Sequence, residues 1–496
     1  MPDPLVVAVD QGSSSTKAVA LDRRGKVVGR ARIPVSESRP RPGWVEQDAE
    51  EIWESVRRAV AGCLAELDPA AVVAVGLSNQ RESVGAWERS SGSPLGPILS
   101  WQDQRTAPLC REVRMDPAKI FAISGLPLDP MFSALKARWL LDHHDPERRR
   151  SRSGEICIGT VDSWLLSRCA KADDQHVVEI GNASRTQLLD LDGRTWSADL
   201  LDEFDVPPAV LPEIRPSDGP FPTVRGLDPL PDGVPVLAVL GDSHAALFGH
   251  GIRTAGVVKV TYGTGSSVMA LVADDHGGNE RGHSAGVCRT IAWQVGDVSV
   301  AYALEGNIRS TGATLQWLAR LLGTTAGDLA EVAATASSDG VHLVPGFNGL
   351  AAPWWDAEAT GLLTGLSLST GPAQVARSAL ESTAFQVADV VDAIRAQGVV
   401  VDRILADGGG SGNDTLMQIQ ADLAGVTVER SARPDVSALG AAYLAGLRAG
   451  LWTEDQLVDL VEQRETFHPQ AHDRGARMAE WHDAIRRARG TTGRTG

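Results

Sequence analysis

Two aspartates stand at the ends of continuous apolar segments of the kind that form buried strands. Asp10 follows residues 5–9, and Asp242 follows residues 235–240 after a single glycine. In open α/β sheets, ligands bind at the carboxyl ends of the strands, where a carboxylate is held on a rigid element. We therefore expect Asp10 to hold Mg²⁺ and Asp242 to act as a general base on a substrate hydroxyl. The alternative for each is an N-cap at the start of a helix, a position that Asp favours.

A charged pair follows another apolar segment, residues 72–78. Arg81 can donate two hydrogen bonds while Glu82 accepts, which is the pattern needed to bind the hydroxyls of a polyol. Trp101 offers a flat apolar surface for a carbon skeleton. The alternatives are a surface ion pair, which contributes little to stability, and a tryptophan that belongs to the core.

A tight turn rich in glycine and hydroxyl side chains occurs once in each half of the chain. The turn at 12–15 lies between predicted strands at 5–10 and 18–21, and the turn at 263–266 lies between predicted strands at 257–260 and 268–272. The two segments align without a gap, which indicates duplication of a supersecondary unit. Backbone N–H groups and hydroxyls in such hairpins bind phosphate, and glycine allows a close approach. Two facing hairpins would hold a polyphosphate from both sides, and the alternative is two ordinary exposed turns.

The rest of the chain alternates strands with helices, which predicts an α/β fold in two similar lobes. Helical spacing of apolar residues occurs at 50–67, 133–142, 310–322 and 371–396. We expect an N-terminal domain over residues 1–252, a C-terminal domain over residues 253–485 and a flexible tail over residues 486–496. The glycine-rich segment 406–414, between a strand and a helix, suits a nucleotide but also occurs in plain loops.

Composition narrows the class of partner. The formal net charge of -16 over 496 residues argues against a nucleic-acid partner. No run of apolar residues is long enough to span a membrane, and the first residues do not resemble a signal peptide. The five cysteines are scattered, which is typical of reduced thiols in the cytoplasm. We expect a cytoplasmic protein with a small-molecule substrate, and a homo-oligomer stays open.

Eleven short motifs give the chain a resemblance to the FGGY family of carbohydrate kinases over nearly its whole length, with the greatest likeness to the glycerol kinases. In order, they are DQGSSSTKAV, GWVEQD, GLSNQRES, SWQDQRT, NASRT, GDSHAALFGHG, TYGTG, ALEG, VPGFNGLAAPWWD, DGGGSGN and ALGAAYLAG. The resemblance implies two actin-like, ribonuclease H-like domains with a cleft between them. It also implies ATP- and Mg²⁺-dependent phosphorylation of a hydroxyl of a small polyol or sugar.

The resemblance implies roles for single residues as well. Asp10 would position Mg²⁺, and Asp242 would be the catalytic base. Arg81, Glu82 and Trp101 would form the polyol site. Contacts to the nucleotide would come from Ser13, Ser14, Lys17, Thr264, Gly312, Gln316, Gly409 and Asn413.

The chain departs from the glycerol kinases at three positions of the substrate site. Met131 stands where they carry Tyr, Ser243 where they carry Gln, and Ser267 where they carry Phe. A site built to bond a hydroxyl discriminates through that bond, so the loss of partners should change the preference. We expect a roomier pocket that accepts a four- or five-carbon polyol or a ketose at least as well as glycerol.

Several functions compete at this point. The main hypothesis is a glycerol kinase-like enzyme, and the alternative within the family is a pentulose kinase such as a xylulose kinase. An actin-like scaffold ATPase and a sugar sensor without catalysis are alternatives of another class, because one fold can serve several functions. The presence of Arg81, Glu82 and both aspartates favours a kinase.

Overall fold

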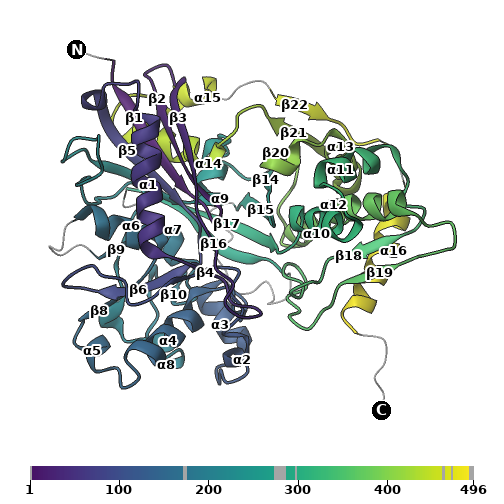
Figure 1. The fold of residues 1–496 in the computed structure, drawn as a ribbon, viewed down its shortest axis with the longest axis horizontal. Coiled ribbons are helices and arrows are strands. Elements are labelled where there is room, and N and C mark those ends of the chain that lie inside the picture. Colours follow the sequence, from purple (N-terminus) through teal and green to yellow (C-terminus); the bar gives the residue numbers. More distant parts are fainter. Residues whose placement is uncertain are drawn as a thin grey trace. The chain divides into compact units, whose positions relative to one another are not determined.

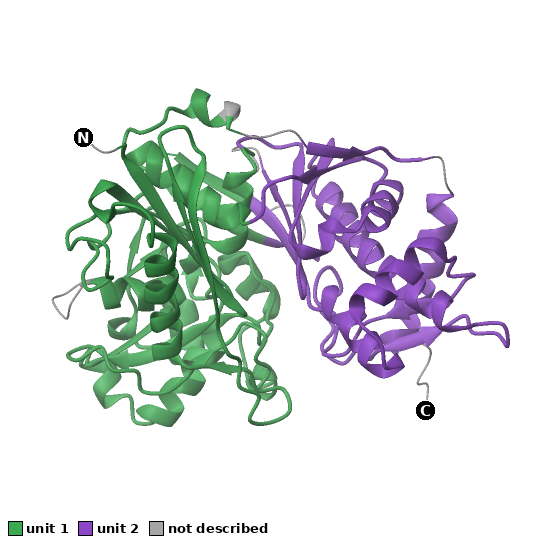
Figure 2. Ribbon diagram, turned by 45° about the horizontal axis from the view of Figure 1, so that its top comes forward, with its two compact units in different colours: residues 1–252, 289–302, 435–461 green, residues 253–288, 303–434, 462–496 purple. Residues whose placement is uncertain are grey.

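Figure 1 shows the computed structural model, which describes residues 3–170, 176–272, 286–296, 299–460, 464–470 and 473–490. The chain divides into two compact units, coloured separately in Figure 2. Unit 1 comprises Met1–Ile252, Arg289–Tyr302 and Asp435–Val461, and unit 2 comprises Arg253–Cys288, Ala303–Pro434 and Glu462–Gly496. The first break falls at the predicted boundary, after Ile252. The units are nevertheless not contiguous halves, because two later segments return to unit 1.

The central sheet of unit 1 has the strand order β13-β5-β1-β2-β3. Strands β1, β5 and β13 run parallel, and the hairpin strands β1, β2 and β3 pair antiparallel. The bounds are β1 Leu5–Gln11, β2 Ser15–Leu21, β3 Val27–Pro34, β5 Val72–Asn79 and β13 Val236–Gly241. The apolar runs predicted as strands thus form one sheet, whose central strands are buried on both faces.

Unit 2 repeats this topology in six neighbouring strands of a seven-stranded sheet, in the order β17-β15-β14-β20-β21-β22. The hairpin strands β14, β15 and β17 pair antiparallel, whereas β14, β20 and β21 run parallel. The bounds are β14 Val257–Tyr262, β15 Ser266–Leu271, β17 Ser299–Ile308, β20 Arg403–Asp407, β21 Thr427–Ser431 and β22 Arg464–Phe467. The predicted duplication of a β-hairpin unit is therefore confirmed.

The two hairpins differ in register. The last pair before the turn is Gln11 with Thr16 in unit 1, but Tyr262 with Ser266 in unit 2. The second turn is therefore one residue shorter, although the sequence alignment contains no gap. Strand bounds follow the local sequence, whereas register follows the turn geometry.

The four segments with helical spacing are helices in the structure: α1 Ala49–Cys63, α4 Ser133–His144, α10 Gly312–Leu322 and α12 Pro372–Ala396. Helix α1 begins at its N-cap Asp48, whose side chain accepts from two backbone N–H groups. It ends before the predicted residue 67, and a separate 3₁₀ turn capped by Asp68 starts at Pro69. A proline disfavours the helical conformation of the residue before it, so Asp68 does not extend α1 into this turn.

Helix α14, Val436–Arg448, belongs to unit 1 because it packs closely on other elements of that unit. It lies against β5 and against α9, Asp242–Gly249. A Cβ on Gly440 would lie 1.8 Å from the carbonyl oxygen of Ala245, and a Cβ on Gly76 would lie 2.5 Å from that of Ala441. Only glycine permits these approaches, and such long-range contacts escape a division made along the sequence.

Helix α12 runs through the core of unit 2 and is buried along most of its length. The C-terminal helix α16, Arg474–Ala488, packs beside it, with Trp481 stacked on Phe385 at 5.1 Å between ring centroids. Helix α16 includes residues 486–488, so the predicted tail is too long by at least that turn. Residues 491–496 lie outside the described residues.

Two further findings concern the helices and the cysteines. None of the helices described is long and apolar enough to cross a membrane. All five cysteines are free thiols, and burial raises the pKa of Cys63 and of Cys169 to about 12. These thiols are therefore poor nucleophiles.

We predict that the pairing of α16 with α12 depends on pH. The Nε2 atom of His482 lies 2.7 Å from Oδ1 of the buried Asp389, and this hydrogen bond raises the pKa of His482. A raised pKa stabilises the fold fully below the usual histidine value of about 6.5, and this stability is lost as the pH rises through the folded value. His482 is 39% exposed, so solvent screening limits the effect to on the order of 1 kcal/mol.

Thermal unfolding of the protein and of His482→Gln at pH 6 and pH 8.5 checks this expectation. The gap in Tm between the two proteins should be larger at pH 6. An equal gap at both pH values would contradict the assignment. Asp389→Asn, which removes the carboxylate charge, should weaken the pH dependence in the same way.

Candidate active site

Three parallel strands of unit 1 end side by side. Gln11 of β1 pairs with Asn79 of β5, and Asn79 also pairs with Gly241 of β13. The segments that leave these ends carry predicted site residues: Asp10 on β1, Arg81 after β5 and Asp242 after β13. The structure therefore brings them together at the carboxyl edge of the sheet, where ligands of open α/β sheets bind.

Asp242 is the first residue of α9, and the cap of that helix is Gly241. The N-cap interpretation of Asp242 is therefore wrong. Its Oδ1 atom accepts from the Nε atom of Arg81 at 3.0 Å and from the backbone N–H of Ser243 at 2.6 Å. The Asp242 side chain is 38% exposed whereas that of Arg81 is 4% exposed, so a buried guanidinium orients an accessible carboxylate.

Asp10 lies inside β1 and caps no helix, so the N-cap interpretation is wrong here as well. Its Oδ1 atom accepts from the hydroxyl of Ser78 at 2.9 Å, and its Oδ2 atom lies 3.8 Å from the Nζ atom of Lys17. Burial raises the pKa of Asp10, Lys17 lowers it, and the negative charges of Asp242 and Asp435 raise it further. A carboxylate in this setting is more stable when a cation is added beside it.

Lys17 is held by a residue that the sequence did not single out. Its Nζ atom lies 3.2 Å from Oδ1 of Asp435, whose Oδ2 atom is 3.2 Å from the Nε atom of Arg30. Burial lowers the pKa of Lys17, but the carboxylates of Asp10 and Asp435 raise it. The net shift of this pKa is upward. The ammonium group thus lies between two carboxylates, at the end of β1 and at the start of α14.

Arg81 and Glu82 are 5% and 4% exposed, so the interpretation as a surface ion pair is wrong. While Arg81 pairs with Asp242, the Oε1 atom of Glu82 accepts from the Nε atom of Arg185 at 2.6 Å. Glu82 has a φ angle of 62°, in the left-handed region that non-glycine residues seldom adopt. This turn is therefore held by partners distant in sequence.

The NASRT motif, residues 182–186, contains Arg185 and also contacts the end of β5. The amide groups of Asn79 and Asn182 exchange hydrogen bonds of 2.9 and 3.2 Å. The fully buried Glu179 accepts from the backbone N–H groups of Gly181 and Asn182, each at 2.8 Å, and burial raises its pKa to about 7. These residues support the turn at Arg81 and Glu82 from behind.

Trp101 and Ser13 are in direct contact, since the indole N–H donates to the Ser13 hydroxyl at 2.9 Å. Ser13 lies 3.3 Å from Oε1 of Gln80, whose amide nitrogen donates to the side chains of Gln11 and Gln47. Trp101 is only partly buried, so it is not a core residue. A predicted polyol residue and a predicted phosphate residue therefore share one polar network, while Ser14 is exposed at the tip of the turn.

Met131 and Ser243 are both buried, at 2% and 7% exposure. Met131 precedes α4, where its backbone N–H donates to Asp129 at 2.9 Å and its carbonyl accepts from Lys136 at 2.7 Å. Ser243 is the second residue of α9, next to Asp242. Both lie in unit 1 with the other predicted polyol residues except Ser267.

Ser267 lies on β15 in unit 2, where its hydroxyl donates to the fully buried Glu305 at 3.1 Å. The hairpin turn beside it is bound to the start of α10. Backbone N–H groups of Gly312 and Ala313 donate to the carbonyls of Gly263 and Thr264 at 3.1 and 3.0 Å. A Cβ on Gly312 would lie 2.6 Å from the Gly263 carbonyl oxygen, so this contact requires glycine.

The remaining predicted nucleotide residues also belong to unit 2. Gln316 is exposed on α10, and Gly409 has open space where a Cβ would stand. The loop of Gly409 lies next to the first hairpin strand, because a Cβ on Gly408 would lie 2.6 Å from the Tyr262 carbonyl oxygen. Asn413 is the N-cap of α13, Asp414–Ala424, and accepts from the Leu416 N–H at 2.8 Å.

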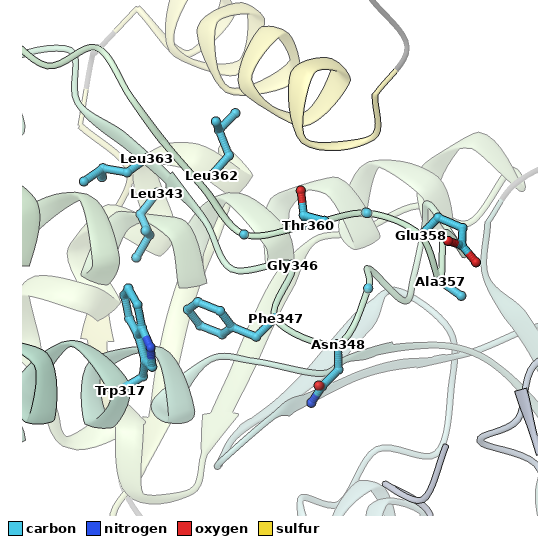
Figure 3. A pocket seen from close by; sticks show the side chains of 13 residues that line it. Trp317, Leu343, Gly346, Phe347, Asn348, Ala357, Glu358, Thr360, Leu362 and Leu363 are labelled. Carbon is cyan, nitrogen blue, oxygen red and sulfur yellow. The ribbon is translucent and has the colours of Figure 1, made fainter. Parts of the chain in front are cut away.

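Figure 3 shows a pocket of about 700 Å³ in unit 2, between α10 and the segments 343–349 and 357–363. Trp317 and Phe347 form its apolar wall, with ring centroids 4.6 Å apart. None of the predicted site residues lines this pocket. Trp317 follows Gln316 on α10 but points to a different side of the helix.

Among the described residues, no group of three or more His, Cys, Asp or Glu side chains could hold a metal ion. Mg²⁺ does not need such a cage, because it keeps several waters and binds one or two carboxylates together with substrate phosphates. The single carboxylate of Asp10, with Asp242 and Asp435 contributing negative charge nearby, fits an ion of this kind.

Models of the FGGY family of carbohydrate kinases match the chain twice, the N-terminal domain over residues 5–249 and the C-terminal domain over residues 258–449. A glycerol kinase of Burkholderia cenocepacia is 40% identical over 99% of both chains. An apulose kinase of Pectobacterium atrosepticum is 40% identical over 98% of both chains. The crystal structure of Plasmodium falciparum glycerol kinase with ADP superimposes with a TM-score of 0.87 at 28% identity, over 98% of each chain.

The match confirms the resemblance drawn from the eleven motifs and the α/β fold of two actin-like, ribonuclease H-like domains. It also confirms a kinase over a scaffold ATPase or a sensor. The chain therefore belongs to the FGGY family of carbohydrate kinases and is an ATP-dependent kinase.

Proposed function

We propose that the enzyme transfers the γ-phosphate of ATP to a terminal hydroxyl of a small polyol or sugar bound in unit 1 beside Asp242. The observation that supports this most strongly is the pairing of an accessible Asp242 carboxylate with the buried Arg81. Phosphoryl transfer requires positioning and charge stabilisation more than covalent chemistry, and this pair supplies a positioned acceptor for the hydroxyl proton.

In the proposed step, Asp242 accepts the proton of the substrate hydroxyl, and that oxygen attacks the γ-phosphorus. The bond from the γ-phosphorus to the bridging oxygen breaks, and ADP leaves. Arg81 and Glu82 bind other hydroxyls of the substrate, and Trp101 contacts its carbon skeleton. Since Arg81 also orients Asp242, substrate binding and the position of the base are linked.

For the nucleotide, we assign the phosphates to Ser13, Ser14 and Lys17 in unit 1 and to Thr264 in unit 2. The residues assigned to the rest of the nucleotide are Gly312, Gln316, Gly409 and Asn413. Asp10 would hold Mg²⁺, which when bound neutralises charge on the phosphates. The direct bond between Trp101 and Ser13 supports a polyol site that adjoins the phosphate turn.

The substrate itself is a finer question. A glycerol kinase and an apulose kinase match the chain at the same 40% identity, so overall similarity does not select between their substrates. Met131, Ser243 and Ser267 replace larger or more polar residues of the glycerol kinases. We therefore propose a four- or five-carbon polyol or ketose as the preferred substrate, and a cytoplasmic location in keeping with the free thiols.

A kinase assay over three- to six-carbon polyols and ketoses checks the substrate proposal. We expect at least one four- or five-carbon compound to match or exceed glycerol in kcat/KM, because the pocket has lost bulk and hydroxyl partners. A preference for glycerol of about tenfold or more over all of them would overturn the proposed preference.

Asp242→Asn should lower kcat by about 10²- to 10⁴-fold, because the amide cannot accept the hydroxyl proton. The dissociation constant for ATP, measured by calorimetry, should stay within about twofold of the original. Ser243→Ala, at the neighbouring position, should change the KM for the polyol more than kcat. Retention of most of kcat in Asp242→Asn would rule out its role as the base.

Asp435→Asn should raise the KM for ATP by about three- to tenfold, because Lys17 loses one of the two carboxylates that hold it. Arg30→Met serves as the control, since Arg30 pairs with the same carboxylate but is half exposed. An unchanged KM for ATP in Asp435→Asn would show that Lys17 does not depend on this residue.

A further inference from the structure

We infer that Lys136 is a positioning residue that fixes Glu82 and Met131 relative to each other and thereby influences substrate selection. Its side chain is fully buried on α4. The Nζ atom donates to the carbonyl of Met131 at 2.7 Å and to the carbonyl of Glu82 at 3.4 Å. The inference rests on the proposed function, because these two residues belong to the proposed polyol site.

Glu82 needs such support because its backbone is in the left-handed region, with φ at 62°. A non-glycine residue in that region is strained and persists only where its surroundings hold it. Ser133, three residues before Lys136 and so on the same face of α4, donates its hydroxyl to the same Glu82 carbonyl at 3.0 Å. The start of α4 therefore holds the carbonyl of Glu82, while Arg185 holds its carboxylate.

Burial of the Lys136 ammonium group has a desolvation cost that a neutral side chain would avoid. Burial lowers the pKa of Lys136 to about 8, although the negative charges of Asp103, Glu82 and Asp129 raise it. A methionine would fill the same space without this desolvation, but it has no hydrogen to donate. An ammonium group has three donors, so one atom can bind two carbonyls that belong to different segments.

The carbonyl of Glu82 belongs to the turn after β5, and the carbonyl of Met131 belongs to the loop before α4. The Nζ atom of Lys136 thus joins the backbones of Glu82 and Met131 through a single atom. Loss of Lys136 should therefore allow both segments to shift, and displacements of about 1 Å at a reacting site can cost on the order of 10²-fold in rate. The carbonyls that Lys136 binds belong to Glu82 and Met131, neither of which is assigned to the nucleotide, so ATP binding should be spared.

Steady-state kinetics of three variants over the same polyol panel test this inference. Lys136→Met removes both bonds, and Ser133→Ala removes one bond to Glu82 while leaving the charge. Lys119→Met is the matched control, because Lys119 is 54% exposed and pairs with Asp199 at the surface of the same unit. For the preferred polyol, kcat/KM should fall about ten- to hundredfold in Lys136→Met and less in Ser133→Ala.

Two features separate positioning from a general loss of structure. The KM for ATP should stay within about twofold, and the ratio of kcat/KM between three- and five-carbon substrates should change in Lys136→Met but not in Lys119→Met. Equal losses for the polyol and ATP together with a lower Tm, or kcat/KM within about twofold of the original, would overturn the inference. If Lys136→Met does not fold, Ser133→Ala gives the same test with a smaller expected change.

Hydrogen exchange distinguishes failure of this inference from failure of the proposed function. The backbone amides of residues 81–84 should exchange faster in Lys136→Met and Ser133→Ala than in the original protein and Lys119→Met. Unchanged exchange at these amides overturns the inference whatever compound the enzyme phosphorylates. Faster exchange in an enzyme that phosphorylates none of the panel would instead reject the proposed substrate class and keep the positioning role.

Discussion

The register of three parallel strands is the constraint on which the rest of the site depends. Because β13, β5 and β1 end level with one another, Asp10, Arg81 and Asp242 lie at the same edge of the sheet. A strand slipped by one residue would turn its side chains to the opposite face. The hydrogen bond from Ser78 to Asp10, between residues that are paired in the sheet, is a direct result of this register.

A polar network under the turn after β5 then fixes what the sheet brings together. Asn79 pairs with Asn182, Glu82 with Arg185, and Gln80 with Gln11 and Gln47. Buried polar groups are costly unless they are bonded, so a hydrogen-bonded network of this kind favours one arrangement. Residues of the GLSNQRES and NASRT motifs therefore support this turn through bonds within the chain.

The duplicated hairpins show how one topology acquires two local forms. In unit 1 the turn carries Ser13, whose hydroxyl accepts from Trp101. In unit 2 the carbonyls of the shorter turn accept hydrogen bonds from the start of α10. One of the donors is Gly312, at a position where only glycine fits. The strand order is common to both units, but the residues that hold each turn differ.

The sequence by itself determined the strands of the two hairpins, the strands at 72–78 and 235–240, four helices, the duplication and the position of both aspartates at strand ends. These features follow from local patterns, since apolar runs, turn residues and helical spacing all lie within a few residues of each other. Asp242 and Arg81 could thus be assigned to a common site before either had a known neighbour.

Only the tertiary structure decided which partners these residues have. Asp242 and Arg81 are 161 residues apart, Glu82 and Arg185 are 103 apart, and Asp435 reaches Lys17 from the second half of the chain. Lys136 looks in the sequence like any lysine of a helix, yet it is fully buried. The physical reason is that pairing between distant segments is set by packing and register, which leave no periodic trace in the sequence around either partner.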